Sequence, residues 1–183
     1  TGNFVAWVEV PTLSVSSDTV LYLYYGGPVA GAATNQNPTG VWDANYAGVW
    51  HLRETPNATN IDSTSNANNG TPTNMESGDQ IAGKVDGSLN FAGVNEVVIT
   101  TDDPLDMDTS DFSLSAWIKA NSTQQNSLPS IIQKGGTSDT VGGYWLRLNG
   151  GNLQVVMSKG SPSTITFGYT GSNDLRDNSW HYV

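Results

Sequence analysis

Short runs of β-branched and aromatic residues alternate with polar, glycine-rich turns along most of this chain, and this alternation constrains the fold more than any single residue does. In residues 112–119 every second side chain is apolar, so one face of a strand would be buried. Residues 144–148 and 153–157 flank Asn149-Gly-Gly-Asn152, a sequence typical of a tight hairpin. No stretch has the sustained i, i+3, i+4 spacing of an amphipathic helix. The pattern predicts an all-β protein, an antiparallel two-sheet sandwich or jelly roll.

Further strand-like runs follow one another at short intervals after residue 41. They cover residues 47–52, 88–91, 97–100, 130–134, 164–169 and 180–183. Residues 53–80 form an irregular polar stretch between two of these runs. Loops of this length in compact domains are usually functional or pinned by specific interactions, so we expect one of the two here.

The N-terminal part differs in composition from the rest. Residues 4–10 and 20–25 are rich in β-branched and aromatic side chains and predict a two-stranded β appendage. Residues 26–40 are small, polar and interrupted by proline, which is typical of a linker. Two such strands are not stable alone, so they must pack on the remainder or lack their own partners. The predicted organisation is a partial β domain at 1–25, a linker at 26–40 and a sandwich at 41–183.

The charge balance excludes two classes of partner. The 183 residues include 17 acidic and 7 basic side chains, a net charge of −10, and the basic residues are scattered singly. Nucleic-acid binding needs Lys and Arg clustered on one face, so we expect none. No apolar run reaches the length of a membrane helix, so we expect no membrane insertion. An acidic surface is compatible with calcium, although self-repulsion for solubility explains it equally well.

Five segments, taken in order, carry a family resemblance. They are Val49-Trp-His-Leu52, residues 62–71, residues 87–93, residues 112–118 and Trp180-His181. Together they resemble laminin-G-like, concanavalin A-like lectin/glucanase modules over residues 41–183. Residues 4–40 resemble the C-terminal part of a small uncharacterised domain that often precedes such modules in bacterial and archaeal surface proteins. The resemblance implies a jelly roll, an extracellular or cell-surface location, glycan or protein binding, and often a bound calcium ion.

The resemblance also bears on the end of the chain. In the family, the segment matching Trp180-His-Tyr-Val183 starts a strand that is followed by at least one more. We therefore expect the sandwich to be incomplete at its C-terminus. A neighbouring subunit could supply a strand to the open sheet edge, which would make the protein a homo-oligomer.

The acidic residues do not predict an enzyme. Glucanases of this fold use two carboxylates at i, i+2 or i+4 spacing on one strand, so that both face the same cleft. The four glutamates are isolated along the chain, at Glu9, Glu54, Glu76 and Glu96. His51 and His181 lie beside Trp50 and Trp180 in strand-like segments, where packing or hydrogen-bonding roles are expected. We expect a non-catalytic protein.

Two segments could supply the oxygen ligands that calcium prefers. The first offers the carboxylate of Asp62 and the amide of Asn66. The second is an acidic loop with four carboxylates within seven residues, namely Asp102, Asp103, Asp106 and Asp108. The alternatives are that Asp62 starts an Asx-type turn and that the acidic loop is simply solvated.

Three aromatic residues with polar or glycine-rich neighbours are candidate glycan platforms, namely Trp42, Trp145 and Tyr169. Core packing is the alternative role for each. Asn57, Asn69 and Asn121 begin N-glycosylation triplets. The sequence thus predicts a non-catalytic extracellular module that binds a glycan or a surface protein. The alternative is a structural subunit of a surface array, adhesin stalk or extracellular filament.

Overall fold

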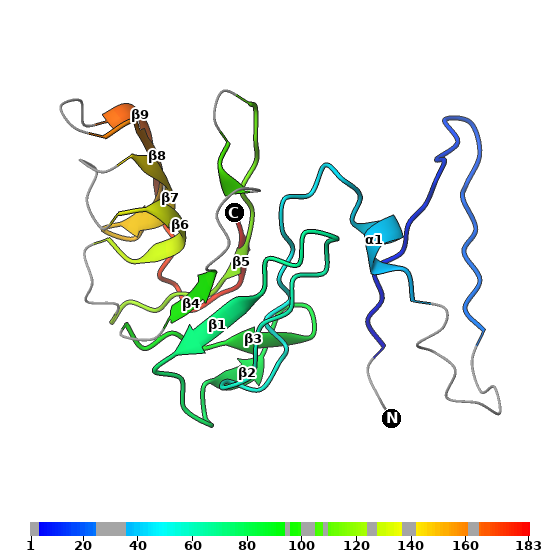
Figure 1. Cartoon of the computed structure of the whole chain (residues 1–183), viewed down its shortest axis with the longest axis horizontal. Helices are drawn as coiled ribbons and strands as arrows, with labels where there is room; N and C mark the ends of the chain where they lie inside the picture. The colour runs from blue at the N-terminus through cyan, green and yellow to red at the C-terminus, as the bar shows by residue number, and fades with distance from the viewer. Residues whose placement is uncertain are drawn as a thin grey trace. The chain divides into compact units, whose positions relative to one another are not determined.

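The computed structural model of the chain describes residues 4–24, 36–93, 96–99, 105–107, 110–123, 128–136, 142–160 and 165–183. Within these ranges the chain is almost entirely β, with ten strands and one helix of four residues (Figure 1). The strand pairs with a resolved register are all antiparallel. The predicted all-β, antiparallel class is confirmed. No helix among these residues is long and apolar enough to cross a membrane.

The elements are named here in chain order. They are α1 (Pro38–Val41), β1 (Gly70–Thr73), β2 (Gln80–Ala82), β3 (Gly87–Leu89), β4 (Glu96–Ile99), β5 (Trp117–Ile118), β6 (Ser130–Gly135), β7 (Gly143–Asn149), β8 (Asn152–Ser158), β9 (Ile165–Asp174) and β10 (His181–Tyr182).

The chain divides into two compact units. Unit 1 comprises residues 1–90 and 97–104, and unit 2 comprises residues 91–96 and 105–183. The boundary thus falls near residue 90 rather than in the expected linker at 26–40. The two units are defined by contacts within the folded chain, whereas the predicted linker at 26–40 was inferred from a change in composition. The two divisions describe different properties, so the linker at 26–40 stays a prediction.

A four-stranded sheet with the order β6-β7-β8-β9 dominates unit 2. Strands β7 and β8 form the predicted hairpin, in which Asn149 pairs with Asn152. The two residues between them, Gly150 and Gly151, have φ angles of +57° and +96°. These left-handed conformations favour glycine and allow a two-residue turn.

Both faces of this sheet are covered along β7. Five consecutive residues from Tyr144 to Leu148 are buried. Because successive strand residues point to opposite faces, this burial means that neither face is open there. Leu146 pairs with Val155 on one face and Trp145 with Val156 on the other. Covering on both faces is typical of a strand in a sandwich.

A second, two-stranded sheet in unit 2 joins β5 and β10. His181 pairs with Ile118 and Tyr182 with Trp117. Ala116 and Val183 extend the pairing through two backbone hydrogen bonds of 2.9 and 3.0 Å. Of the strand expected over residues 112–119, only Trp117 and Ile118 are assigned to a strand, and the backbone pairing with the segment of β10 continues to Ala116.

Unit 1 holds shorter pieces of sheet. Strand β2 pairs antiparallel with β3, and β1 lies beside β4. The strand expected at residues 47–52 contributes a single bridge, from Trp50 to Asp62. Leu52 has a φ of +53°, a left-handed conformation that turns the chain out of a strand.

The N-terminal segment departs from the prediction. Residues 4–24 carry no assigned strand, although two were expected at 4–10 and 20–25. Within unit 1 the segment contacts later residues through Trp7, whose ring stacks on His51 at a centroid distance of 5.4 Å. Extended segments need a pairing partner to become strands. Helix α1, which was also not predicted, starts with Asn37-Pro38, and the Asn37 side chain accepts a hydrogen bond from Gly40 N at 3.1 Å.

Candidate functional site

An open hollow of about 330 Å³ lies in unit 2, between the end of the four-stranded sheet and strand β10. Its lining comes from Leu153 of β8, the second half of β9, the loop after it and β10. The residues are Leu153, Tyr169, Gly171, Ser172, Asn173, Leu175, His181, Tyr182 and Val183. The hollow is thus formed by segments close to the end of the chain together with one residue of the central hairpin.

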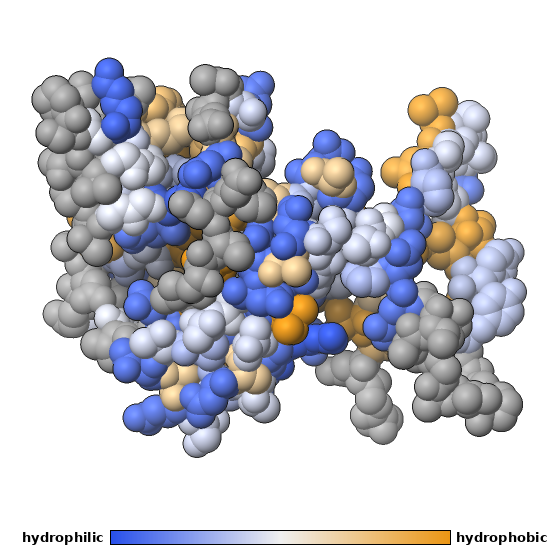
Figure 2. All heavy atoms as spheres, viewed as in Figure 1, coloured by the Kyte–Doolittle hydropathy of each residue, from blue (hydrophilic) through white to orange (hydrophobic). Residues whose placement is uncertain are grey.

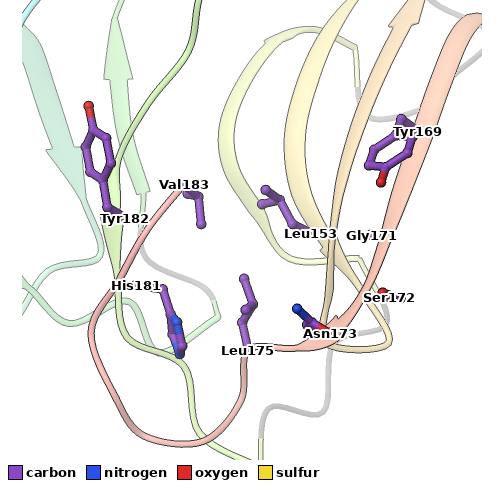
Figure 3. A pocket seen from close by; sticks show the side chains of 9 residues that line it. All are labelled: Leu153, Tyr169, Gly171, Ser172, Asn173, Leu175, His181, Tyr182 and Val183. Atoms are coloured by element: carbon purple, nitrogen blue, oxygen red, sulfur yellow. The ribbon is translucent and has the colours of Figure 1, made fainter.

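The hollow has an apolar floor and a polar rim. In Figure 3 the side chains of Leu153, Leu175 and Val183 point toward one another across it. Tyr169 lies on β9 at its edge with 64% of its surface exposed. Ser172 and Asn173 follow on the same strand and add a hydroxyl and an amide. Apolar surface bordered by an aromatic ring and uncharged polar groups suits a small, neutral, amphipathic ligand.

One ion pair and one histidine–carboxylate hydrogen bond lie at the end of β9 and in the loop that follows it. Arg176 binds Asp174 through Nε to Oδ1 at 3.0 Å and through Nη2 to Oδ2 at 2.7 Å. These hydrogen bonds, with the one from the Arg176 backbone, lower the pKa of Asp174 to about 2. His181 Nε2 lies 2.9 Å from Asp177 Oδ1, and this contact lowers the pKa of Asp177. Both carboxylates therefore ionise more readily than an ordinary aspartate, and they lie in the segment that borders this side of the hollow.

Strand alternation places an aromatic pair on the other face of the β5–β10 sheet. The rings of Trp117 and Tyr182 lie 5.3 Å apart and are 41% and 64% exposed. Figure 3 shows the Tyr182 ring directed away from Leu153, while Val183 points toward that residue. Sequence reasoning assigned both aromatics to strands and missed their exposure, because the register that pairs Tyr182 with Trp117 has no local signal.

Of the three predicted aromatic platforms, Tyr169 alone lines the hollow. Trp145 is 2% exposed, so its ring offers no face to a ligand. Trp42 lies in unit 1, in a cluster of aromatic rings with centroid distances of 5.3 Å to Trp7, 5.1 Å to Tyr46 and 5.9 Å to His51. Burial in this cluster, followed by the nearby charge of Arg53, lowers the pKa of His51.

The Asp62 carboxylate is fully engaged in hydrogen bonds within unit 1. Oδ1 accepts from Val49 N and Thr64 N, both at 2.9 Å. Oδ2 accepts from Thr64 Oγ1 at 2.8 Å and from Asn68 N at 2.9 Å. A carboxylate has about four lone-pair sites, and these four donors occupy them. Asp62 therefore does not fit the role of a calcium ligand.

The neighbouring amides complete the same network. Asn66 Nδ2 donates to the carbonyls of Tyr46 and Ala47 at 3.2 and 3.1 Å. Asn68, 1% exposed, donates to Ala47 O, and its own carbonyl accepts from Trp50 Nε1 at 2.8 Å. Residues 62–68 of the long polar stretch are thus pinned by hydrogen bonds to residues 46–50, which is one of the two outcomes expected for residues 53–80.

The acidic loop gives no calcium cluster among the residues that the structure covers. Asp106 forms an ion pair with Lys134, with Oδ1 and Nζ 3.0 Å apart. Asp102, Asp103 and Asp108 lie outside the described residues. No group of three or more His, Asp or Glu side chains within the described ranges could hold a metal ion.

Comparison with known proteins adds a family to this geometry. The model of the concanavalin A-like lectin/glucanases superfamily, of laminin G type, matches residues 92–183. The chain belongs to this superfamily. The resemblance seen in the sequence is confirmed over that range, which takes in the described hollow. No curated protein and no solved structure matches the chain.

Membership in the concanavalin A-like superfamily makes the matched region a lectin-like or binding module. Laminin-G-like domains of lectin type are generally non-catalytic. The lining of the hollow contains aromatic, imidazole, amide, hydroxyl and aliphatic groups, which suit the binding of a ligand. The resemblance of residues 4–40 to a separate small domain lies outside the match and stays a prediction.

Proposed function

We propose that the matched region is a non-catalytic glycan-binding module of an extracellular or cell-surface protein, and that its ligand is a neutral sugar bound in the hollow beside Tyr169. The observation that carries the proposal is the position of Tyr169, a predicted platform residue that is 64% exposed at the edge of an open hollow. An aromatic ring stacks on the apolar face of a pyranose, while nearby polar groups bond its hydroxyls.

The surroundings favour a neutral rather than an acidic sugar. The lining contains no Lys or Arg side chain, and the nearby Arg176 is bound by Asp174 through two hydrogen bonds. The chain as a whole carries a net charge of −10, which repels uronates and sulfated glycans. Ser172 and Asn173 can donate to and accept from sugar hydroxyls without any charge.

The proposal is tested by a glycan array followed by calorimetric titration of the hits. Tyr169→Ala should weaken binding of a neutral glycan at least about fivefold, since one aromatic stacking contact contributes about 1 kcal/mol or more. Phe167→Ala is the matched control: Phe167 lies two residues earlier on β9, is 49% exposed and does not line the hollow.

An equal loss of affinity in both variants would mean that β9, rather than the hollow, is disturbed. Binding of acidic glycans alone would contradict the proposed ligand class. An array without hits, on folded protein, would remove the glycan proposal altogether.

A further inference from the structure

A second hollow, of about 380 Å³, lies within unit 2 at the ends of three neighbouring strands. Strand β6 ends there, β7 begins there and β8 ends there, and the three lie side by side in the four-stranded sheet (Figure 1). The lining of the second hollow shares no residue with the hollow beside Tyr169. Its volume is within the range of about 300–1,000 Å³ that is typical of small-molecule sites.

The strand register builds the floor of the second hollow. Lys134 pairs with Tyr144, and Tyr144 pairs with Met157, so these three side chains point to the same face of the sheet. The Phe112 ring packs against the Tyr144 ring at a centroid distance of 5.2 Å. Tyr144 Oη donates to Leu105 O at 3.1 Å, which ties the preceding loop to the sheet. Two aromatic rings and a thioether therefore give the second hollow an apolar floor.

The rim of the second hollow is basic, in contrast to the chain as a whole. The lining contains the two lysines Lys134 and Lys159 and one aspartate, Asp106, whereas the chain has 17 acidic and 7 basic side chains. Lys134 Nζ lies 3.0 Å from Asp106 Oδ1, so these two charges largely compensate each other. Lys159 follows β8, is exposed, and forms no ion pair with any residue in the described ranges. One uncompensated positive charge thus borders an apolar floor.

The hydroxyl groups of the second hollow are already engaged within the protein. Tyr144 Oη donates to Leu105 O, and Ser158 Oγ accepts from Gly160 N at 3.1 Å. A sugar, which carries hydroxyls on every side, would find few partners on the apolar floor. Figure 2 shows hydrophilic residues over most of the surface visible there, with hydrophobic residues in separate patches, so an apolar floor beside a lysine differs from that background.

We infer that the second hollow binds a carboxylate that carries an apolar or aromatic side group. The carboxylate accepts from the ammonium of Lys159, and the side group covers the rings and the thioether of the floor. Two kinds of molecule have this chemistry, namely small aromatic acids and the C-terminal end of a peptide whose last residue is apolar. The inference is independent of the glycan proposal, because the two linings have no residue in common.

The first test is a titration of the whole chain with N-acetyl-L-phenylalanine, followed through its amide NMR signals. Binding should saturate with a Kd of about 1 mM, a value that a ligand of this size can reach. The signals of Gly142, Gly143 and Lys159 should shift, whereas those of Gly171 and Ser172 in the other hollow should not. The absence of saturable shifts up to about 20 mM, or shifts confined to the other hollow, would overturn the inference.

The second test assigns the carboxylate to Lys159. The probe is compared with N-acetyl-L-phenylalaninamide, which has the same body without the charge. The acid should bind the wild-type chain about threefold or more tighter than the amide, and the two should bind Lys159→Gln equally. Because the acid and the amide are compared on each protein, the result reports the contact of carboxylate and ammonium rather than a change in stability.

Lys119→Gln is the matched control, since Lys119 is also exposed in unit 2 and lines neither hollow. It should keep the preference for the acid, and that preference should shrink in about 500 mM salt, which screens the contact. An equal preference for the acid in the wild type and both variants would exclude Lys159 as the partner and overturn the inference.

The third test concerns the apolar floor and the source of the acid. N-acetylglycine lacks the benzyl group and should bind about tenfold more weakly than N-acetyl-L-phenylalanine, because no ring is buried. A preference for methyl glucuronoside, whose carboxylate sits on a polar body, would contradict the floor. The last comparison is between 3-phenylpropionate and the acetylated tripeptide alanyl-alanyl-phenylalanine. Tighter binding of the first would assign the second hollow to small acids, and tighter binding of the second to peptide ends.

Discussion

Asp62 shows at the scale of one residue why a plausible metal ligand can be a structural group. Its two oxygens accept four hydrogen bonds, three of them from backbone amides that the loop would otherwise leave without an acceptor. The side chain is 5% exposed, so water cannot replace these bonds. A sequence shows the carboxylate and its neighbouring Asn, Ser and Thr residues but not the directions of the donors, and calcium ligands and Asx turns use the same residue types.

Asp62→Asn should therefore destabilise the fold by about 1–3 kcal/mol, because the amide replaces one accepting oxygen with a donor that faces other donors. Urea unfolding measures the change. Asp86→Asn is the control, since Asp86 is exposed and meets Arg53 only at 3.8 Å, and exposed ion pairs contribute little. The loss should be the same in calcium and in chelator. Rescue by calcium would show that Asp62 acts through a metal after all.

At the scale of the element, the β7–β8 hairpin could be predicted because its signal is local. Asn149-Gly-Gly-Asn152 specifies a two-residue turn, and the turn fixes the register of both strands. The strands expected at 4–10 and 20–25 have a strong propensity as well, but a strand exists only when a partner is present. Leu52 illustrates a third case: no propensity indicates that a leucine will adopt a φ of +53°.

The candidate site, like the strands, could be predicted from the sequence only in part. Tyr169 was found because its neighbours are polar, whereas Ser172, Asn173 and Leu175 were missed because β9 runs to Asp174, beyond the expected end at residue 169. Whether Tyr182 or Val183 faces the hollow depends on pairing with β5 across more than sixty residues of sequence.

The two turn glycines of the hairpin give a matched pair of substitutions. Gly150→Ala places its methyl group in open space and meets only the cost of a left-handed backbone, about 1–2 kcal/mol. Gly151→Ala has a larger backbone cost, because its φ of +96° lies outside the small left-handed region open to other residues, and its methyl group also collides with the side chains of Asp174 and Arg176. We expect Gly151→Ala to be the more destabilising and to raise the pKa of Asp174 from about 2 toward its ordinary value. Urea unfolding and NMR titration measure the two effects, and equal stability of the variants would contradict the contact.

For the whole molecule, net charge is the main influence on stability outside the core. Seventeen acidic side chains face seven basic ones, and several of the bases are already paired, such as Arg176 with Asp174 and Lys134 with Asp106. The remaining carboxylates repel one another in the compact state more than in the expanded chain. Salt screens this repulsion over a distance of about 10 Å at 0.1 M, so the native state gains stability as ionic strength rises.

We therefore expect the melting temperature at pH 7 to rise by several degrees between about 10 mM and 500 mM sodium chloride. In a protein whose stability depends mainly on ion pairs, the melting temperature would fall instead, because salt weakens those pairs. Near pH 4 many ordinary carboxyl groups are protonated and the net charge is small, so the same addition of salt should change the melting temperature little. A melting temperature that falls with salt at pH 7 would show that the paired charges, rather than the net charge of −10, set the electrostatics of the fold.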